Sequence, residues 1–270
     1  MKKLSFIAVA FAALALGACT GNKGGQTDAA AAQDSLRAFE QEQIEASIKL
    51  NLDSLAAEIG RLQNMPVVRK DGMIALSDEE KQVKPDYLLD PAVAENAMTL
   101  AEQYRVLSAL HVDKALAELY EMPTGEYDKA IAKLVAAIND PSFKVVDSDA
   151  ALNENAQALY QAMEDNGRIN YFWQLITSSL VEQLFIVSQN SDKFLAAMDD
   201  DAASEISLRI VLIQDAIARL TDYDAALLPV ADAMEPLYVI NAISVDEFKA
   251  QIAQCKDDIA ESRKLLTCVR

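Results

Sequence analysis

Glycine, histidine and cysteine are scarce in this sequence of 270 residues, and each scarcity excludes a class of protein. Beyond Gly60 only Gly72, Gly125 and Gly167 remain, which leaves little room for β-hairpins or for loops that cradle phosphates. One histidine, His111, and three cysteines are too few for a zinc site of the usual kind. We therefore expect no metal and no cofactor, and we identify no catalytic residues.

Basic residues are also in deficit. The chain has 24 Lys and Arg against 42 Asp and Glu, which gives a formal net charge of −18. Such a balance argues against binding to nucleic acid and against electrostatic docking on anionic lipid. The simplest explanation of the negative charge is that it keeps the protein soluble. The alternative is that it recognises a basic partner.

Helix-forming residues dominate what is present, since alanine alone supplies 45 of the 270 residues. Apolar residues recur at three- and four-residue spacing, which predicts an all-α bundle of about eight helices with near-parallel packing. The predicted helices span residues 34–63, 92–121, 126–139, 149–166, 169–189, 200–221, 224–240 and 244 to about 269.

Local signals refine two of these helices. Ser244 and Glu247 form a predicted capping box, and Ile243 with Phe248 occupy the positions of a hydrophobic staple. Two prolines, at positions 229 and 236, predict that the helix of 224–240 is kinked or split.

The chain contains one faint internal similarity. Residues 127–138 (YDKAIAKLVAAI) resemble residues 223–234 (YDAALLPVADAM), and each stretch follows a helix with Arg, apolar residues and Asp. This pattern predicts two divergent helix-pair repeats.

The start of the chain reads as a targeting segment. Two lysines precede an apolar run from residue 4 to residue 18, which as a helix would span about 22 Å, short of a hydrocarbon core of about 30 Å. Residues 1–18 are therefore a predicted signal peptide. The sequence Leu16-Gly17-Ala18-Cys19 resembles the lipobox of bacterial lipoproteins. That resemblance implies cleavage before Cys19 and attachment of lipid to its thiol, so that the protein contacts the membrane through this anchor; an ordinary secreted protein is the alternative.

The next residues predict how the chain continues from the anchor. Residues 19–33 are small, polar and without periodicity, which indicates a flexible tether with a reach of about 20 Å. The helical domain then covers 34–270. No acidic stretch follows Cys19, so we expect the periplasmic face of the outer membrane, with the cell surface as the alternative. Residues 110–143 resemble uncharacterised helical lipoproteins of the Bacteroidetes, a likeness that implies no function.

The helix of 169–189 is apolar on most of its circumference and contains the single tryptophan, Trp173. Its polar residues Gln174, Ser178 and Glu182 are spaced four apart, and we expect this stripe to face water or to line a cleft. We also expect Glu182 to pair with Arg209, because each is surrounded by apolar residues.

Four further residue groups have a structural and a functional interpretation. His111 is expected at the margin of the core rather than in catalysis. Cys255 is expected to be buried and, about 20 Å from Cys268 on one helix, unable to form a disulfide with it. The run 199–201 (DDD) is expected to cap a helix, since it lacks the pattern of a calcium-binding loop. The long connection 65–91 either packs over the bundle or docks a partner.

Three functions are compatible with these observations. The first is a non-enzymatic envelope lipoprotein whose helical domain binds another envelope protein. The second is a helical domain that binds a small or amphipathic ligand in an apolar cleft near Trp173. The third is an enzyme that uses carboxylates alone, which requires two of them to converge in a pocket.

Overall fold

The structure is a computed structural model, and it describes residues 43, 45–68, 74–145 and 156–268. The chain divides into two units, residues 1–47 and 48–270. In the first unit the described residues are Gln43 and 45–47, all helical. Cys19, the tether of 19–33 and the start of the predicted helix 149–166 lie outside the described residues.

The second unit is an α-helical bundle, which confirms the predicted fold class. Of the described residues 77% are helical and none is in a strand. Residues 48–59 form a helix. The α-helices that follow are α2 (Asp78–Gln82), α3 (Leu100–Leu119), α4 (Gly125–Ile138), α5 (Ala156–Asp165), α6 (Ile169–Gln189), α7 (Ser191–Phe194), α8 (Asp200–Leu220), α9 (Leu228–Met234), α10 (Val245–Gln254) and α11 (Lys256–Thr267).

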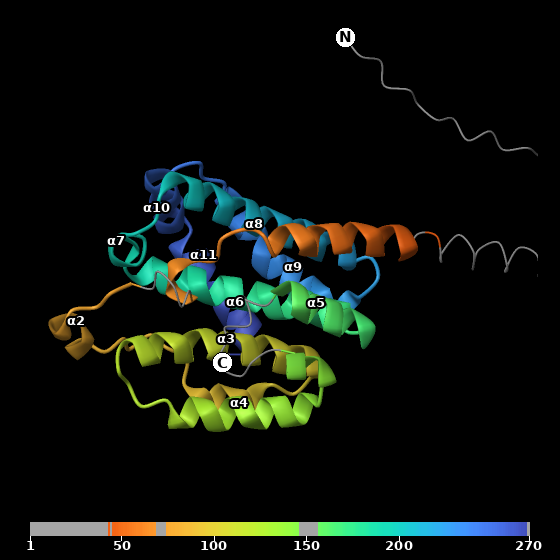
Figure 1. Cartoon of the computed structure of the whole chain (residues 1–270), viewed down its shortest axis with the longest axis horizontal. Coiled ribbons are helices and arrows are strands. Elements are labelled where there is room, and N and C mark those ends of the chain that lie inside the picture. The colour runs from red at the N-terminus through yellow and green to blue at the C-terminus, as the bar shows by residue number, and fades with distance from the viewer. Residues whose placement is uncertain (1–42, 44, 69–73, 146–155, 269–270) are drawn as a thin grey trace, which may run out of the picture. The chain divides into compact units, whose positions relative to one another are not determined.

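Short 3₁₀-helices connect these elements: η1 (Pro66–Val68), η2 (Pro91–Asn96), η3 (Pro141–Val145), η4 (Ala225–Leu227) and η5 (Glu235–Val239). Figure 1 shows α3, α4 and α6 running along one another. Helix α6 is central, because it packs against α3, α5, α8 and α11. This position explains why α6 is apolar on most of its circumference.

The predicted and observed helix bounds agree best for α4, α6 and α8. The predicted helix of 92–121 is instead two elements, because Thr99 and Glu102 form a capping box that starts α3 after η2. The predicted split of 224–240 is confirmed: Pro229 lies in the first turn of α9 and Pro236 in the first turn of η5. The first helix ends at Ile59, four residues earlier than predicted.

The last predicted helix is also interrupted, at Cys255, between α10 and α11. Ser244 caps α10 as predicted, by accepting a hydrogen bond from Glu247 N–H. The predicted hydrophobic staple between Ile243 and Phe248 is wrong, because Ile243 is 72% exposed while Phe248 is fully buried. The other hydrogen bond of the predicted capping box differs. The Glu247 carboxylate accepts a hydrogen bond from the backbone N–H of Ile243 and not from that of Ser244, the cap residue.

The two predicted repeats have the same order of elements, but their second helices differ in length and continuity. Helix α3 packs on α4, and α8 packs on α9, as two helix pairs require. However, α4 is a continuous helix of 14 residues, whereas α9 has seven residues with a 3₁₀-helix on each side. Pro229 and Pro236 account for the difference, since proline cannot donate the backbone hydrogen bond that a longer helix needs.

The two ends of the connection 65–91 pack on the bundle, as the packing interpretation predicts. Val83 between them is 75% exposed, and the docking interpretation stays a prediction. Met65 and Val67 are fully buried, and η1 contacts both α3 and α6. Leu89 is buried, and its carbonyl accepts a hydrogen bond of 2.8 Å from Tyr127 Oη. Lys81 pairs with Glu121 at 2.5 Å. Residues 69–73 lie outside the described part.

Candidate functional site

The polar residues of α6 lie in the interior of the bundle. Gln174, Ser178 and Glu182 are all fully buried, so the expectation that they face water or line a cleft is wrong. They contact residues of α3 and α11 instead. We call these residues and their partners the polar seam, which comprises Arg105 and Asp113 of α3, Gln174, Ser178 and Glu182 of α6, and Arg263 of α11.

One end of the polar seam is organised by Arg105. Its Nη1 donates to Gln174 Oε1 at 2.5 Å, and its Nε donates to the carbonyl of Leu266 in α11 at 3.2 Å. Ser178 Oγ donates back to the carbonyl of Arg105 at 2.8 Å. These three hydrogen bonds connect α3, α6 and α11. Because buried polar groups must be hydrogen-bonded, they also favour one relative register of the three helices.

The other end is organised by Arg263. Its Nε donates to both carboxylate oxygens of Glu182 at 2.9 Å, and its Nη2 lies 2.7 Å from Glu182 Oε1 and 3.5 Å from Asp113 Oδ2. The guanidinium also lies 3.9 Å from the centre of the Phe185 ring. Asp113 Oδ2 accepts a hydrogen bond of 2.7 Å from Leu89 N–H. Arg263 thus serves two carboxyl groups with one positive charge.

The shared charge determines which carboxyl group keeps its proton. Burial, followed by the nearby charge of Glu182, raises the pKa of Asp113 well above its ordinary value. Asp113 Oδ1 has no hydrogen-bond partner among the described residues, so a negative charge on this buried carboxyl group would be incompletely stabilised. Glu182 accepts hydrogen bonds from Arg263 through both of its oxygens, which is the geometry of an Arg–carboxylate ion pair. The cluster is therefore neutral overall when Asp113 is protonated.

Two carboxyl groups do converge here, but the geometry of a catalytic pair also requires access for a substrate. Asp113 and Glu182 are each 0% exposed. Among the described residues no group of His, Cys, Asp or Glu is arranged to hold a metal ion. The polar seam is thus enclosed by protein, and what it can do chemically is hold one proton and one ion pair between three helices.

The predicted pair between Glu182 and Arg209 is wrong. Arg209 Nη1 donates to the carbonyls of Ile59 and Leu62, at 3.2 and 3.4 Å. Carbonyls at the end of a helix lack partners within it, and a positive charge there is favourable. Burial lowers the pKa of Arg209 to about 10, which still leaves the side chain charged at neutral pH. Arg209 therefore stabilises the C-terminal end of the first helix.

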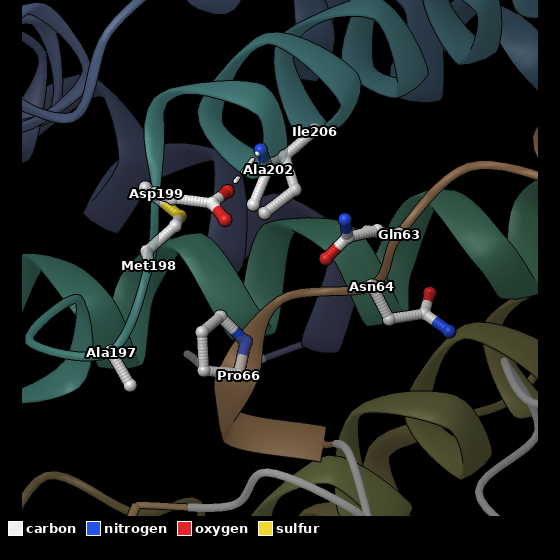
Figure 2. Close-up of a pocket in the computed structure, with 8 residues that line it drawn as sticks. All are labelled: Gln63, Asn64, Pro66, Ala197, Met198, Asp199, Ala202 and Ile206. Carbon is white, nitrogen blue, oxygen red and sulfur yellow. Dashed lines mark hydrogen bonds between the residues drawn. The ribbon is translucent and has the colours of Figure 1, made fainter.

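A pocket of about 220 Å³ opens beside the start of α8 (Figure 2). The Asp199 carboxylate accepts a hydrogen bond of 2.8 Å from Ala202 N–H, which confirms that Asp199 caps this helix. The bond uses one carboxylate oxygen, Oδ1, and Asp199 also lines the pocket. The pocket is lined by Gln63, Asn64, Pro66, Ala197, Met198, Asp199, Ala202 and Ile206.

Trp173 belongs to the packed core and not to the wall of this pocket. Its side chain is 0% exposed. The rings of Tyr160 and Phe172 pack edge-to-face against it, with centroid distances of 6.3 and 5.4 Å. Aromatic rings therefore occupy space that a ligand beside Trp173 would need.

The remaining residues singled out from the sequence also lie in structural positions. His111 is partly buried on α3, and burial together with the charge of Lys114 lowers its pKa to about 4. Cys255 is a buried free thiol, as predicted. Cys268 lies one residue beyond α11, with a positive φ of 58°.

A second feature lies on the surface. Large apolar side chains are exposed on two elements: Leu208 (44%) and Val211 (37%) on α8, and Tyr238 (55%) and Val239 (44%) on η5. We call these four residues the apolar strip. Sequence reasoning missed it, although Leu208 and Val211 stand out as apolar residues on the otherwise polar face of their helix.

The chain matches no protein-family model, and no curated protein and no solved structure is significantly similar to it. In the described part of the chain, no helix has the length and apolar character needed to cross a membrane.

Proposed function

We propose that this chain is a cell-envelope lipoprotein, held at the periplasmic face of the outer membrane by lipid on Cys19, whose helical domain binds another protein and catalyses no reaction. The lipid anchor is supported by the sequence Leu16-Gly17-Ala18-Cys19 after an apolar segment of signal-peptide length. Two or more acyl chains hold a protein stably on a bilayer.

The observation that carries the binding function is the apolar strip. Exposed apolar residues that are grouped, rather than scattered singly, are typical of interaction sites. The carboxyl groups that converge in the polar seam, Asp113 and Glu182, are enclosed, which favours binding over catalysis there. A tethered domain with a small apolar surface fits a protein that holds a partner near the membrane.

The anchor is tested by replacing Cys19 with Ser in cells and separating membrane and soluble fractions. We expect the variant to remain unprocessed at this position and to incorporate no labelled fatty acid, whereas the unchanged chain incorporates it. Fatty-acid labelling of the Cys19→Ser chain would contradict the proposal. A Cys268→Ser chain is the matched control and should be labelled normally.

The binding function is tested by placing a photo-crosslinking amino acid at exposed positions of the full chain in cells. We expect adducts of discrete size at one or more of Leu50, Val211, Tyr223 and Tyr238, all of which are exposed. Absence of adducts at every position would contradict a protein-binding function.

A further inference from the structure

Two hydrogen bonds connect the segments that carry the apolar strip. Ser207 Oγ accepts a hydrogen bond of 3.0 Å from Ala242 N–H, and Gln214 Nε2 donates to the Met234 carbonyl at 3.0 Å. The segment of 234–242 therefore runs alongside α8, in the opposite direction, between these two bonds. Val211 of α8 and Tyr238 of η5 both lie midway between the two bonds in sequence, which places the two parts of the strip on neighbouring segments.

Acidic side chains frame the strip. Asp201 and Asp215 lie seven residues before and after Leu208, which places all three on the same face of α8. Glu235 precedes Tyr238 by three residues in a 3₁₀-helix, where residues at this spacing are directly aligned. Asp215 is bonded to Arg219 at 2.9 Å, whereas Asp201 and Glu235 have no salt bridge among the described residues.

The surroundings of the strip contain almost no compensating positive charge. From residue 199 to residue 247 the sequence holds eleven Asp or Glu, two Arg and no Lys. One of these arginines, Arg209, is buried and bonded to the first helix, and the other, Arg219, is bonded to Asp215. The segment of 199–247, which carries the strip, is thus strongly negative.

We propose that the apolar strip binds an amphipathic helix of a partner protein that carries Lys or Arg beside its apolar face. This inference rests on the proposed binding function and adds the chemistry of the partner. Apolar residues three apart on α8, such as Leu208 and Val211, form a ridge against which a second helix packs. Basic side chains beside the apolar face of that helix would meet Asp201 and Glu235, and such complementarity accelerates and orders the encounter.

The same charges disfavour two other occupants. In a symmetric dimer the strip would face its own copy, so that the acidic frames of both copies would be brought together. An anionic membrane surface would be repelled in the same way. A basic partner is the occupant that both the apolar and the acidic side chains favour.

The test uses the full chain in detergent and a fluorescent 18-residue helical peptide with leucines on one face and lysines on the other. We expect binding by fluorescence anisotropy that weakens as salt is raised. The double variant Leu208→Ser/Tyr238→Ser should bind about tenfold more weakly or worse. A matched double variant, Leu50→Ser/Tyr223→Ser, removes the same residue types from exposed positions outside the strip and should bind within about twofold of the unchanged chain.

A second pair of measurements isolates the charge. We expect Asp201→Asn/Glu235→Gln to weaken binding by about threefold to tenfold and to reduce its salt dependence, because two attractive charges are lost. A peptide with Glu in place of every Lys should bind at least about tenfold more weakly than the lysine peptide.

Several results would overturn the proposal. The first is that the lysine peptide does not bind the unchanged chain. The second is that the lysine peptide binds equally to the strip variant and to its matched control. The third is that the Glu peptide binds the unchanged chain as tightly as the lysine peptide does. Sedimentation showing a dimer that Leu208→Ser/Tyr238→Ser dissociates would assign the strip to a second copy. Adducts in cells at Leu50 or Tyr223, with none at Val211 or Tyr238, would overturn this inference and leave the proposed binding function standing.

Discussion

The polar seam and the apolar strip are opposite departures from the usual distribution of side chains. In the seam, charged and polar groups of α3, α6 and α11 lie in the interior, and only Arg263 is partly exposed, with 12% of its side chain accessible. In the strip, leucine, valine and tyrosine are exposed on α8 and η5. The seam finds most of its partners within the chain, because Arg105 donates to Gln174 and Arg263 donates to Glu182. The strip has no equivalent cover within the described residues, which is why we assign it to an external partner.

The comparison also separates two energetic roles. Each group in the seam depends on its neighbours, since a buried charge without its partner costs far more than the pair contributes. Residues of the strip contribute little to folding, because their side chains already contact water. Substitutions in the two regions should therefore differ in both size and kind of effect.

The largest effect is expected from Arg263→Met, which leaves the buried Glu182 carboxylate without its cation. We expect a loss of about 3–5 kcal/mol in the free energy of unfolding, measured by urea denaturation at neutral pH. Arg219→Met removes an exposed arginine paired with Asp215 and should cost at most about 1 kcal/mol. Equal losses for the two variants would show that the seam is not energetically distinct.

A smaller loss is expected from Val67→Ala, which tests whether the connection 65–91 belongs to the core. Val67 is 1% exposed, so its truncation should cost about 2 kcal/mol in the same measurement. The matched control is Val83→Ala in the same connection, where the side chain is 75% exposed and the loss should stay below about 0.5 kcal/mol. A negligible loss for Val67→Ala would contradict the packing described here.

The third prediction concerns the proton on Asp113. Its pKa is raised in the folded protein, so the stability it contributes is fully present below about pH 4 and is lost as the pH rises through the raised value. In Asp113→Asn the side chain is neutral at every pH. The unchanged chain should therefore lose stability relative to this variant as the pH rises from 4 to about 8. We expect this change to be smaller than the loss in Arg263→Met.

The free energy of unfolding of the unchanged chain must be compared with that of Asp113→Asn at each pH, because the pH dependence of one protein alone also contains other groups. His111 acts with the opposite sign: its pKa is lowered to about 4, so its contribution is present above its unfolded pKa of about 6.5 and is lost as the pH falls. Both proteins retain His111, so the difference between their urea denaturation curves reports Asp113 alone. A difference that does not vary with pH would show that Asp113 is ionised in the folded state.

The smallest effect on stability is expected in the strip. Leu208→Ser/Tyr238→Ser should change the free energy of unfolding by less than about 0.5 kcal/mol per site, because both side chains are surface residues, 44% and 55% exposed. Circular dichroism melting curves would check this. A large fall in melting temperature would mean that the strip supports the fold, and would weaken its assignment as a binding surface.

Much of the fold could be read from local signals. The bounds of α6 follow from its continuous apolar sequence, and the break around Pro229 and Pro236 follows from the chemistry of proline. The capping box of Thr99 and Glu102 was equally visible and would have separated η2 from α3. The interruption at Cys255 has no comparable signal, since no proline or glycine stands there.

Much less of the candidate site could be predicted. Arg263 lies in the sequence ESRKLL, which resembles the exposed face of an ordinary helix. The sequence predicts that Glu182 needs a positive partner and points to Arg209, whereas the partner in the structure is Arg263. Either arginine satisfies the chemical requirement, and only their positions in the folded chain distinguish them.

The sequence by itself determined that this protein is helical, where its central helix begins and ends, and that its surface is acidic. These properties follow from local propensity, from periodicity and from composition. Tertiary structure alone decided that Gln174, Ser178 and Glu182 face α3 and α11, and that Leu208 and Val211 face water. Periodicity fixes the direction in which a side chain leaves its helix, whereas the element that lies in that direction depends on contacts between residues far apart in the chain.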